Sequence, residues 1–435
     1  MAHYFFNRFT SENLIYWGLL LFYVIFFFNL TIDSGSNWKL LQIIILLFPL
    51  VLYKNKRIVM NINIFITIFS AFIFIYLNEL FFHSSQQLTN LDNDLFIDRW
   101  NLQFLYVLVL ILLPTIFYRS KFNSDIFFKI IIISTIISLI YNLFISIILS
   151  FDRSLLVGKF PILILYDYSI ISLTLLAFCY SFKFKKTISY ILISLCLANI
   201  TIITLHGSRG AWLGIPIILL FIFIFNYKSE KNKVIFSLAL SSIIALLLIY
   251  LPQSPITQRM DQFKADTTLM EKQNYHSSVG NRVALWKFSL ESFAESPIYG
   301  VGTKKLTQDI CTLKNKGVIP VCNPHLHNIF LQELASHGIL GFLAVILTLF
   351  TPLIYFIRTL MNTYDRELRV LAISGICFTG YIIICGLTDY ILFQNFITML
   401  LYLVLITLMS FIYHRKNLIQ NSPSKSTNQP NSVTL

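Results

Sequence analysis

Long apolar stretches separated by short polar connections dominate this chain. A transmembrane helix needs about 20 apolar residues, and by that rule the chain holds about twelve such segments. They lie near residues 14–32, 39–54, 59–82, 103–118, 125–149, 163–182, 187–205, 211–227, 233–251, 338–357, 368–387 and 391–413. The second and fourth segments are the short ones. The pattern predicts an all-α polytopic membrane protein.

One polar connection is far longer than the others and divides the chain. The expected regions are a bundle of nine helices (1–251), a long loop (252–337), three further helices (338–413) and a polar tail (414–435). Pro252-Gln253-Ser254-Pro255 predicts a turn at the start of the loop. Apolar residues at helical spacing between Arg282 and Glu295 predict an amphipathic helix. The tail beyond Asn421 is poor in apolar residues, which predicts disorder.

Basic residues mark every second connection. They are Lys54, Lys56 and Arg57, then Arg119 and Lys121, Lys183, Lys185 and Lys186, Lys228, Lys231 and Lys233, Arg358, Arg366 and Arg369, and Arg415 and Lys416. The alternate connections include residues 33–36 and the acidic loop with Asp92, Asp94 and Asp98. Cytoplasmic connections of membrane proteins are enriched in Lys and Arg. Both termini are therefore expected in the cytoplasm and the long loop on the other side.

The composition agrees with a membrane protein. Of 435 residues, 56% are apolar and 12% are charged, and the mean hydropathy is +0.73, whereas soluble domains carry about 25% charged residues. The net charge of +13 does not indicate nucleic-acid binding, because the basic residues lie between apolar segments rather than along one face. The first apolar segment is long enough to span a membrane and lacks a cleavage pattern, so no cleaved signal peptide is expected.

Six cysteines fall into two groups. Cys179, Cys196, Cys377 and Cys385 lie inside apolar segments and are expected to be inert core thiols. Cys311 and Cys322 lie in the long loop. If that loop is outside the cytoplasm, a disulfide between them is compatible with the compartment, although spacing alone leaves two free thiols as an alternative.

The segment Asn323-Pro324-His325-Leu326-His327-Asn328 closes the long loop. Histidine accepts a proton near pH 7, so it suits general base catalysis. His325 and His327 share a face if the segment is extended, and Pro324 favours extended backbone before it. Two other interpretations stay open, namely interfacial histidines without a chemical task and a metal site completed by Glu333 or His337. We expect no metal.

A second polar cluster, His206-Gly207-Ser208-Arg209-Gly210, separates the seventh and eighth apolar segments. Its arginine lies on the side opposite the cytoplasm, against the usual charge bias, and its planar guanidinium suits phosphate. The two glycines allow a close backbone approach. The alternative is an arginine that only extends to the membrane rim.

Further charged residues are weaker candidates. Arg282 begins the predicted loop helix, where the helix dipole adds to the attraction for anions, although it could also be an ordinary solvated charge. Arg153 lies on the same side, and Asp389 lies in the last tight turn, where it could orient an arginine or a histidine. Asp167 and Glu79 lie inside apolar segments and are functional candidates for that reason, but the sequence names no partner for them.

Together these motifs resemble the bacterial O-antigen ligase and O-antigen polymerase superfamily. The resemblance is carried by Ser208-Arg209-Gly210-Ala211-Trp212-Leu213, by Arg282-Val283-Ala284-Leu285-Trp286 with Pro297 and Gly300-Val301-Gly302, and by His327-Asn328 followed by Gly338 and Gly341. The spacing His-Asn-x9-Gly-x2-Gly resembles the ligase motif. The resemblance covers most of the chain.

The resemblance implies a fold like that of GT-C glycosyltransferases and an inverting, metal-independent glycosyl transfer without a cofactor, in lipopolysaccharide biosynthesis. The donor would be undecaprenyl-diphosphate-linked glycan, and the acceptor a sugar hydroxyl of lipid A–core, at the periplasmic face of the bacterial inner membrane. His327 would activate the acceptor, and Arg209 and Arg282 would bind the diphosphate. The residues expected to contact substrate are His325, Asn328, Arg153 and Asp389.

Other functions remain possible at this stage. The same superfamily includes polymerases, which use a second lipid-linked repeat as acceptor, and protein O-oligosaccharyltransferases. A transporter of lipid-linked glycan would carry charged residues at the bilayer midplane, whereas the key charges here gather at one rim. A glycine-rich phosphate loop after a strand, typical of nucleotide binding, is not found in the sequence.

Overall fold

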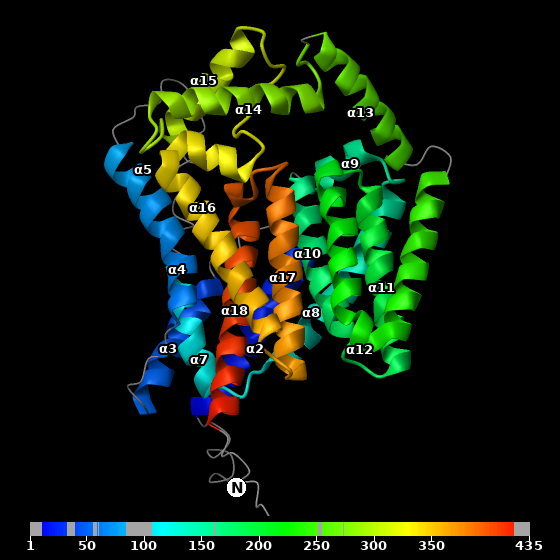
Figure 1. Ribbon diagram of the computed structural model, residues 1–435, viewed down its shortest axis with the longest axis vertical. Helices are drawn as coiled ribbons and strands as arrows, with labels where there is room; N and C mark the ends of the chain where they lie inside the picture. Colours follow the sequence, from blue (N-terminus) through cyan, green and yellow to red (C-terminus); the bar gives the residue numbers. More distant parts are fainter. Residues whose placement is uncertain are drawn as a thin grey trace, which may run out of the picture.

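A bundle of long helices carries a small cap of three helices at one end (Figure 1). The computed structural model describes residues 11–32, 40–54, 59, 61–83, 107–160, 162–250, 255–272 and 274–421. Every regular element within these ranges is a helix. The cap consists of α13 (Pro255–Glu271), α14 (Ser278–Glu295) and α15 (Thr303–Asn315), and we call its end of the bundle the cap end.

All twelve predicted apolar segments coincide with helices. In chain order these are α2 (Ser11–Ile32), α3 (Leu41–Lys54), the run α4 (Ile62–Ala71), η2 (Phe72–Tyr76) and α5 (Leu77–Phe82), the pair η3 (Leu108–Leu112) and α7 (Leu113–Arg119), α8 (Ser124–Ile148), α10 (Leu163–Ser181), α11 (Lys186–Leu205), α12 (Arg209–Tyr250), α16 (Ile329–Met361), α17 (Arg366–Gly386) and α18 (Asn395–Gln420). Within the described ranges, nine helices are long and apolar enough to cross a membrane, while α3 and the η3–α7 pair are shorter. The all-α polytopic fold is confirmed.

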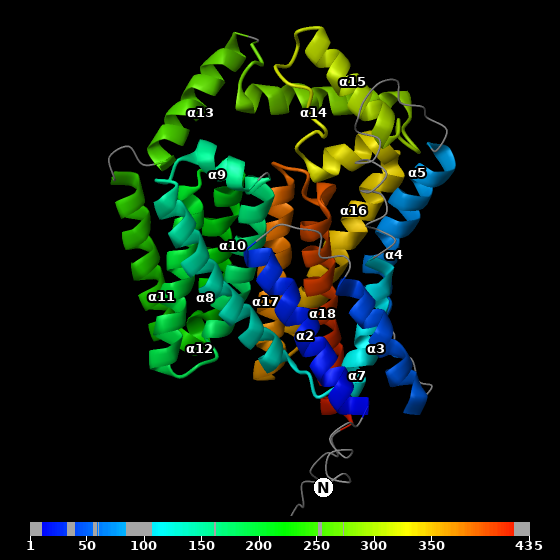
Figure 2. The same cartoon turned by 180° about the vertical axis from the view of Figure 1, so that it is seen from behind.

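Two of the predicted segments lie within α12. Its backbone leaves helical geometry at Glu230, where φ is −138° and ψ is 43°, and the helix folds back into two antiparallel arms (Figure 1 and Figure 2). The short helix α9 (Arg153–Lys159) lies at the cap end, close to the start of the first arm.

The centre of the bundle differs from its periphery. In α10 and α18, 94% of an 18-residue apolar stretch of the helix is buried inside the protein, compared with 17% in α12. The outward side of α12 exposes large apolar residues such as Leu220, Phe221 and Ile224. A large exposed apolar surface of this kind marks contact with lipid.

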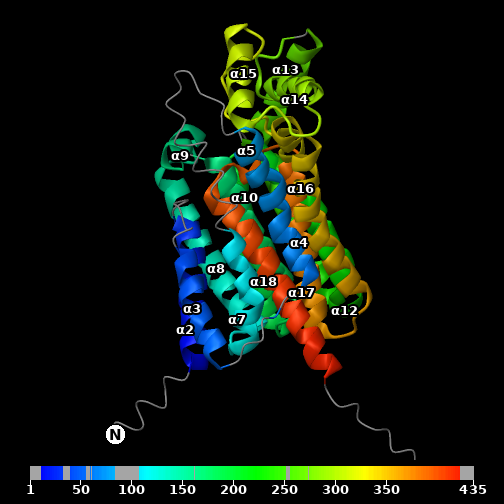
Figure 3. The same cartoon turned by 90° about the vertical axis from the view of Figure 1, so that its left-hand side faces the viewer.

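The basic connections gather at the end opposite the cap. There Arg366 donates to the carbonyl of Lys183 and to Oε1 of Glu230, at 3.3 Å in both cases, and Lys231 lies in the same basic hollow. The start of α2 and the end of α18 lie at this end as well (Figure 3). The bundle therefore has a basic end and a cap end.

The cap has a small apolar core of its own. It includes Leu285 of α14, Leu306 and Ile310 of α15, and Leu326 of the segment that follows. A disulfide joins Cys311 to Cys322. The predicted amphipathic helix is found within α14, whereas α13 was not predicted, because its mostly polar sequence offers no apolar stripe of helical period.

The last part of the cap joins the bundle through a break in α16. Gly338 has φ +65° and ψ −153°, so the part before it lies across the bundle end and the rest descends through the bundle (Figure 1). The backbone of residues 297–302 runs alongside: Val301 N–H donates to Ala335 (3.0 Å) and Ile339 N–H donates to Pro297 (2.9 Å). A Cβ at Gly300 would lie 2.3 Å from the Ser336 carbonyl. The motif glycines therefore permit direct backbone contact.

Some predictions concern residues outside the described ranges. These are the charges of Lys56 and Arg57, the loops at 33–36 and 92–98, the turn at Pro252-Gln253-Ser254 and the tail after Asn421.

Candidate functional site

His327 lies in the segment between the cap and α16, and its backbone is left-handed. Its φ is +51°, an uncommon value outside glycine that is often found at functional sites. Ring Nδ1 lies 3.2 Å from Oδ1 of Asp389. An ionised carboxylate only accepts hydrogen bonds, so Nδ1 carries the proton and Nε2 keeps the lone pair. The pair thus has the arrangement of a general base and its orienting acid.

Asp389 lies in the turn between α17 and η4 (Ile391–Phe393). Its Oδ1 also accepts the backbone N–H of Tyr390 at 2.8 Å. Burial alone would raise the pKa of Asp389, but the hydrogen bond from His327, the electrostatic interactions with His327 and His325 and the positive charge of Arg282 outweigh burial and lower the pKa to about 2. The carboxylate is therefore ionised at neutral pH and suited to hold the imidazole in one orientation.

The other ring nitrogen of His327 lies near Asn323. Nε2 lies 3.4 Å from Oδ1 of Asn323, and because both atoms are acceptors in this tautomer they form no hydrogen bond. The His327 side chain is 23% exposed. An incoming hydroxyl can therefore reach Nε2 without displacing a strong contact.

His325 lies directly beside His327. The ring centroids are 4.3 Å apart, which confirms that the two side chains share a face. Burial, aided by neighbouring His327, lowers the pKa of His325 to about 3, so the ring is neutral. Its Nδ1 accepts the backbone N–H of His327 at 3.3 Å. In this geometry His325 supports the left-handed backbone of His327.

Asn328 ties the histidine segment to two helices. Its Oδ1 accepts the N–H groups of Phe330 and Leu331 at the start of α16, at 2.9 and 3.0 Å, which is an N-cap. Its Nδ2 donates to the carbonyl of Leu387 after α17 (3.0 Å). Asn328 therefore fixes the residue before it relative to Asp389, and its expected contact with substrate stays a prediction.

Arg209 is the first residue of α12, at the cap end. Its Nη2 lies 3.5 Å from Oδ2 of Asp266 on α13. The next residue must be small, because a Cβ at Gly210 would lie 2.2 Å from the Tyr168 hydroxyl and 3.0 Å from Oγ1 of Thr388. Gly210 thereby brings Arg209 close to the turn that holds Asp389.

Arg282 lies on α14, above the same turn. The helix begins at Ser278 with Ser277 as N-cap, so Arg282 is one turn inside, not at the helix start as the sequence suggested. The dipole contribution falls off within the first turn, and the side chain's own charge remains. That charge acts on both Asp389 and His325. Trp286 of α14 donates to the carbonyl of Leu326 (3.1 Å), which fixes α14 over the histidine segment.

A cavity of about 580 Å³ connects these groups. Arg209, Arg282 and Arg259 line it, as does Thr388, the residue before Asp389. Its remaining wall is largely apolar and includes Trp212 and Phe263. The cavity therefore brings several cations next to the turn of Asp389, although Asp389 and His327 are not among its lining residues.

Arg153 of α9 lies beside this cavity, although it does not line it. Its Nη1 donates to the carbonyl of His206 at 2.7 Å and lies 3.4 Å from Oγ of Ser208. Arg153 thus borders the loop that leads into Arg209.

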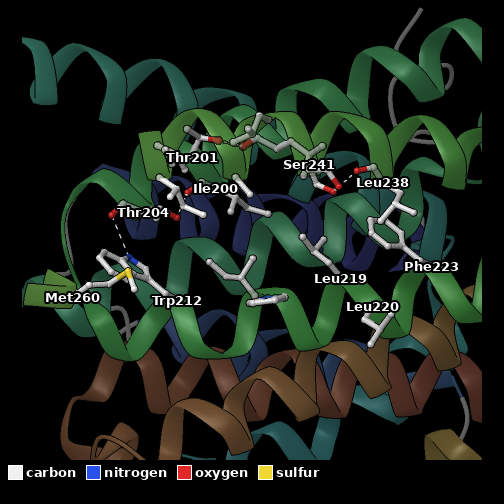
Figure 4. A pocket seen from close by; sticks show the side chains of 18 residues that line it. Ile200, Thr201, Thr204, Trp212, Leu219, Leu220, Phe223, Leu238, Ser241 and Met260 are labelled. Atoms are coloured by element: carbon white, nitrogen blue, oxygen red, sulfur yellow. Dashed lines mark hydrogen bonds between the residues drawn. The ribbon is translucent and has the colours of Figure 1, made fainter. Parts of the chain in front are cut away.

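An apolar groove of about 600 Å³ adjoins the cavity, between α11 and the two arms of α12. Figure 4 shows residues such as Thr204, Leu219 and Leu238 along it, and Met260 beside Trp212 at one end. Trp212, Pro216 and Met260 line both the groove and the arginine cavity. A continuous path therefore leads from an apolar groove to a cationic site.

One group in the described part of the chain has metal-ligand geometry. Ligand atoms of His325, His327 and Asp389 all lie within 4.8 Å of one another. The third ligand is therefore Asp389, whereas the sequence had suggested Glu333 or His337. The positive charge of Arg282 acts on the same group and opposes a divalent cation there.

The two intramembrane carboxylates have partners that the sequence could not name. Asp167 lies 2.8 Å from Nδ1 of His206. Glu79 lies 3.0 Å from Nε2 of His337, whose Nδ1 lies 2.6 Å from Glu333. All five side chains are buried. These pairs stabilise the packing beneath the site and do not line the cavity.

Several site residues escaped the sequence analysis. Arg259 and Asp266 of α13 were missed because that helix was not predicted. Thr388 and Asn323 lie next to expected residues, but a single polar side chain in a turn carries no distinguishing signal. Position in the fold alone brings them to the site.

The fold and the site define a multi-pass membrane protein with a cationic cavity and a histidine–aspartate pair at one rim. Residues 191–346 match the family model described as O-Antigen ligase. The chain is 34% identical over 185 residues to an uncharacterized protein of Haemophilus influenzae, covering 40% of this chain and 44% of that protein. It is 22% identical over 240 residues to the O-antigen ligase of Escherichia coli K12, covering 54% of each.

These matches support the resemblance to the O-antigen ligase superfamily over part of the chain. The matched regions span about half the length of these curated relatives. The resemblance seen in the sequence motifs is thereby confirmed at the level of the superfamily.

Proposed function

We propose that this protein is an O-antigen ligase that transfers a glycan from undecaprenyl diphosphate to a sugar hydroxyl of lipid A–core. One observation carries the proposal: the arginine cavity reaches the turn of Asp389 at one end and continues into an apolar groove at the other. A lipid-linked diphosphate sugar needs a base beside its sugar, cations at its diphosphate and an apolar channel for its lipid, in this order. The match to the family model supports the same reaction class.

In the proposed reaction His327 is the general base. Nε2 removes the proton from the acceptor hydroxyl while Asp389 stabilises the imidazolium that forms. The hydroxyl oxygen attacks the anomeric carbon, and the bond from that carbon to the phosphate oxygen breaks with its electron pair leaving on the diphosphate. Attack from the opposite face inverts the anomeric configuration. His325 and Asn328 hold the backbone on either side of the base.

Arg209 and Arg282 bind the diphosphate and stabilise the charge that develops on it. Guanidinium groups form paired hydrogen bonds with phosphate oxygens, and fixed charges in a site shielded from water are worth more than in solution. Arg153 supports the loop before Arg209. The donor arrives already activated, so the reaction needs no nucleotide, and we propose that it needs no metal.

The apolar groove suits the isoprenoid chain of the donor. Its lining is largely aliphatic and aromatic. Of its hydroxyl residues, Thr201, Thr204 and Ser241 donate to backbone carbonyls of their own helices. A chain in the groove would deliver its diphosphate past Trp212 to the arginines. Binding both substrates in one orientation supplies part of the rate.

We propose that the cap end faces the periplasm of the inner membrane and that both termini are cytoplasmic. The gathering of Lys and Arg at the opposite end supports this orientation, and so does the disulfide in the cap.

The test is glycan transfer by the purified protein in detergent, with lipid-linked donor and lipid A–core acceptor. We expect transfer without nucleotide or ion gradient, no loss with a chelator, and loss of at least about 10²-fold in His327→Ala. Transfer by His327→Ala at the wild-type rate would show that His327 is not the general base. Inhibition by chelator that is reversed by a divalent metal would favour a metal at His325, His327 and Asp389. Movement of donor across vesicles without transfer would indicate a transporter.

The acceptor separates the members of the superfamily. A strain lacking an O-antigen ligase accumulates polymerised glycan on the carrier lipid and unsubstituted lipid A–core. Lipid A–core bearing a single repeat would instead indicate a polymerase, and loss of glycan from proteins alone would indicate a protein O-oligosaccharyltransferase.

A further inference from the structure

Three arginines from three elements surround the loop before α12. Arg153 of α9 donates to the carbonyl of His206 (2.7 Å). A Cβ placed on Gly207 would lie 3.5 Å from Nε of Arg259 and 3.7 Å from Nη1 of Arg153. Arg209 follows two residues later as the first residue of α12. We call Arg153, Arg209 and Arg259 the arginine cluster.

The cluster is short of negative charge. Burial and the neighbouring positive charges lower the pKa of Arg259, and burial with the charge of Arg209 lowers that of Arg153. Asp167 attracts Arg153, and its Oδ1 is bonded to Nδ1 of His206 at 2.8 Å, so one carboxylate faces two of the cations at most. Close cations repel each other unless an anion lies between them.

Asp266 is the carboxylate nearest to Arg209, and it satisfies the arginine poorly. The atoms Nη2 of Arg209 and Oδ2 of Asp266 are 3.5 Å apart, beyond a good charge-assisted hydrogen bond. Within the described residues, Nη1 of Arg209 and Oδ2 of Asp266 are both buried without a hydrogen-bond partner. Leaving such atoms unbonded is costly. A group with more acceptor oxygens than a carboxylate would satisfy the guanidinium of Arg209 better.

The two α13 residues face the cluster together. Arg259 and Asp266 are seven residues apart on a continuous helix, which is close to two turns and puts them on one face. The charges of Asp266 and Arg209 both act on Arg259. Helix α13 thus presents one cation and one anion to the same place.

We propose that Asp266 occupies the place of a phosphate group at Arg209, and that Arg259 and Arg153 bind the incoming phosphate once Asp266 is displaced. The ligand is a diphosphate, either on an isoprenoid lipid or free, and the assignment rests on the proposed function. The arginine cluster then binds one phosphate group of the diphosphate, and Arg282 remains near the other end of the cavity. Asp266 is a built-in competitor that pairs with Arg209 when no diphosphate is bound.

The experiment measures binding of two probes, farnesyl diphosphate and inorganic diphosphate, to the purified full chain by calorimetry. Asp266→Asn keeps the shape and removes the competing charge, so we expect about threefold tighter binding of both probes. Arg259→Ala removes a charged phosphate contact, so about tenfold weaker binding is expected. The matched controls are Asp261→Asn and Lys272→Ala, which remove exposed charges in and directly after the same helix and should bind like the wild type.

Each outcome decides the proposal. Asp266→Asn binding no more tightly than Asp261→Asn, or Arg259→Ala binding as well as Lys272→Ala, overturns it. Binding of farnesyl diphosphate alone, unaffected by Arg259→Ala, also overturns it, because the affinity then comes from the lipid chain. If Asp266→Asn and Arg259→Ala bind both probes like the wild type while the wild type transfers glycan normally, this proposal is wrong and the proposed function is unaffected. If the variants change binding as expected but the wild-type protein transfers no glycan, only the proposed function is contradicted.

Discussion

At the scale of single residues, the carboxylate of Asp389 sets the state of the proposed base. It lies 3.2 Å from Nδ1 of His327 across 62 residues of sequence, and its pKa of about 2 keeps it ionised. A neutral histidine in this contact has its lone pair on Nε2, on the side that an acceptor hydroxyl can reach. The ability of His327 to act as the proposed base therefore depends on Asp389, which lies in the turn after a different helix.

Asp389→Asn should reduce glycan transfer by about 10²-fold or more, because an amide in this place no longer stabilises the imidazolium or selects the tautomer. The measurement is the transfer rate of the purified variant at saturating donor and acceptor. Asp125→Asn is the control, since Asp125 is also bonded to a cation, Lys183, far from the cavity. Equal rates for the two variants would show that Asp389 has no part in the reaction.

At the scale of elements, the break in α16 connects the cap to the bundle. Gly338 has φ +65° and ψ −153°, a region that is open almost only to glycine. A Cβ there would also lie 2.4 Å from the Ile298 carbonyl oxygen and 2.7 Å from N of Gly300. The break directs the histidine segment across the bundle end, so its geometry and the site depend on each other.

Gly338→Ala should destabilise the protein by at least about 1–3 kcal/mol from backbone strain alone, with the backbone clash adding to that. The measurement is the midpoint of thermal aggregation of the detergent-solubilised protein. Gly158→Ala is the matched control, because a Cβ at Gly158 meets nothing within 4 Å and its φ is ordinary. A midpoint for Gly338→Ala as high as that of Gly158→Ala would contradict the close approach of the two backbones.

At the scale of the whole molecule, charge separates the two ends. Basic connections gather opposite the cap, while the arginines at the cap end surround a cavity. The positive-inside tendency concerns short loops, so Arg153 and Arg209, which lie in short connections at the cap end, need another reason to be there. In the proposed function a bound diphosphate would supply that reason, and the reaction would occur on the same face.

This orientation predicts the labelling of single introduced cysteines. In cells with a permeabilised outer membrane, a membrane-impermeant maleimide should label Lys272→Cys in the cap, whereas Lys231→Cys at the basic end should react only after lysis. Both positions are exposed, and the cysteines in the bundle are buried. The reverse pattern would place the cavity in the cytoplasm and refute the proposed periplasmic reaction.

The parts that were predictable have a local signal. Apolar runs gave the helices of the bundle, and the doublet of His325 and His327 gave a shared face, because both depend on neighbours within a few residues. The position of Arg282 inside α14 was misjudged by one turn, because helix boundaries are poorly defined by sequence and the cap at Ser277 was not recognised. Helix α13 has no apolar stripe, so neither it nor Arg259 and Asp266 could be found.

The sequence by itself determined that this chain lies in a membrane as a helical bundle and that its notable cations and histidines fall on one side. The apolar character of the runs and the charge bias of the connections are properties of short stretches. They do not depend on how the helices pack against one another. Only the tertiary structure decided which groups touch: His327 with Asp389, Arg209 with Asp266, Glu79 with His337. Those contacts join residues far apart in the chain, and helix packing alone brings them together.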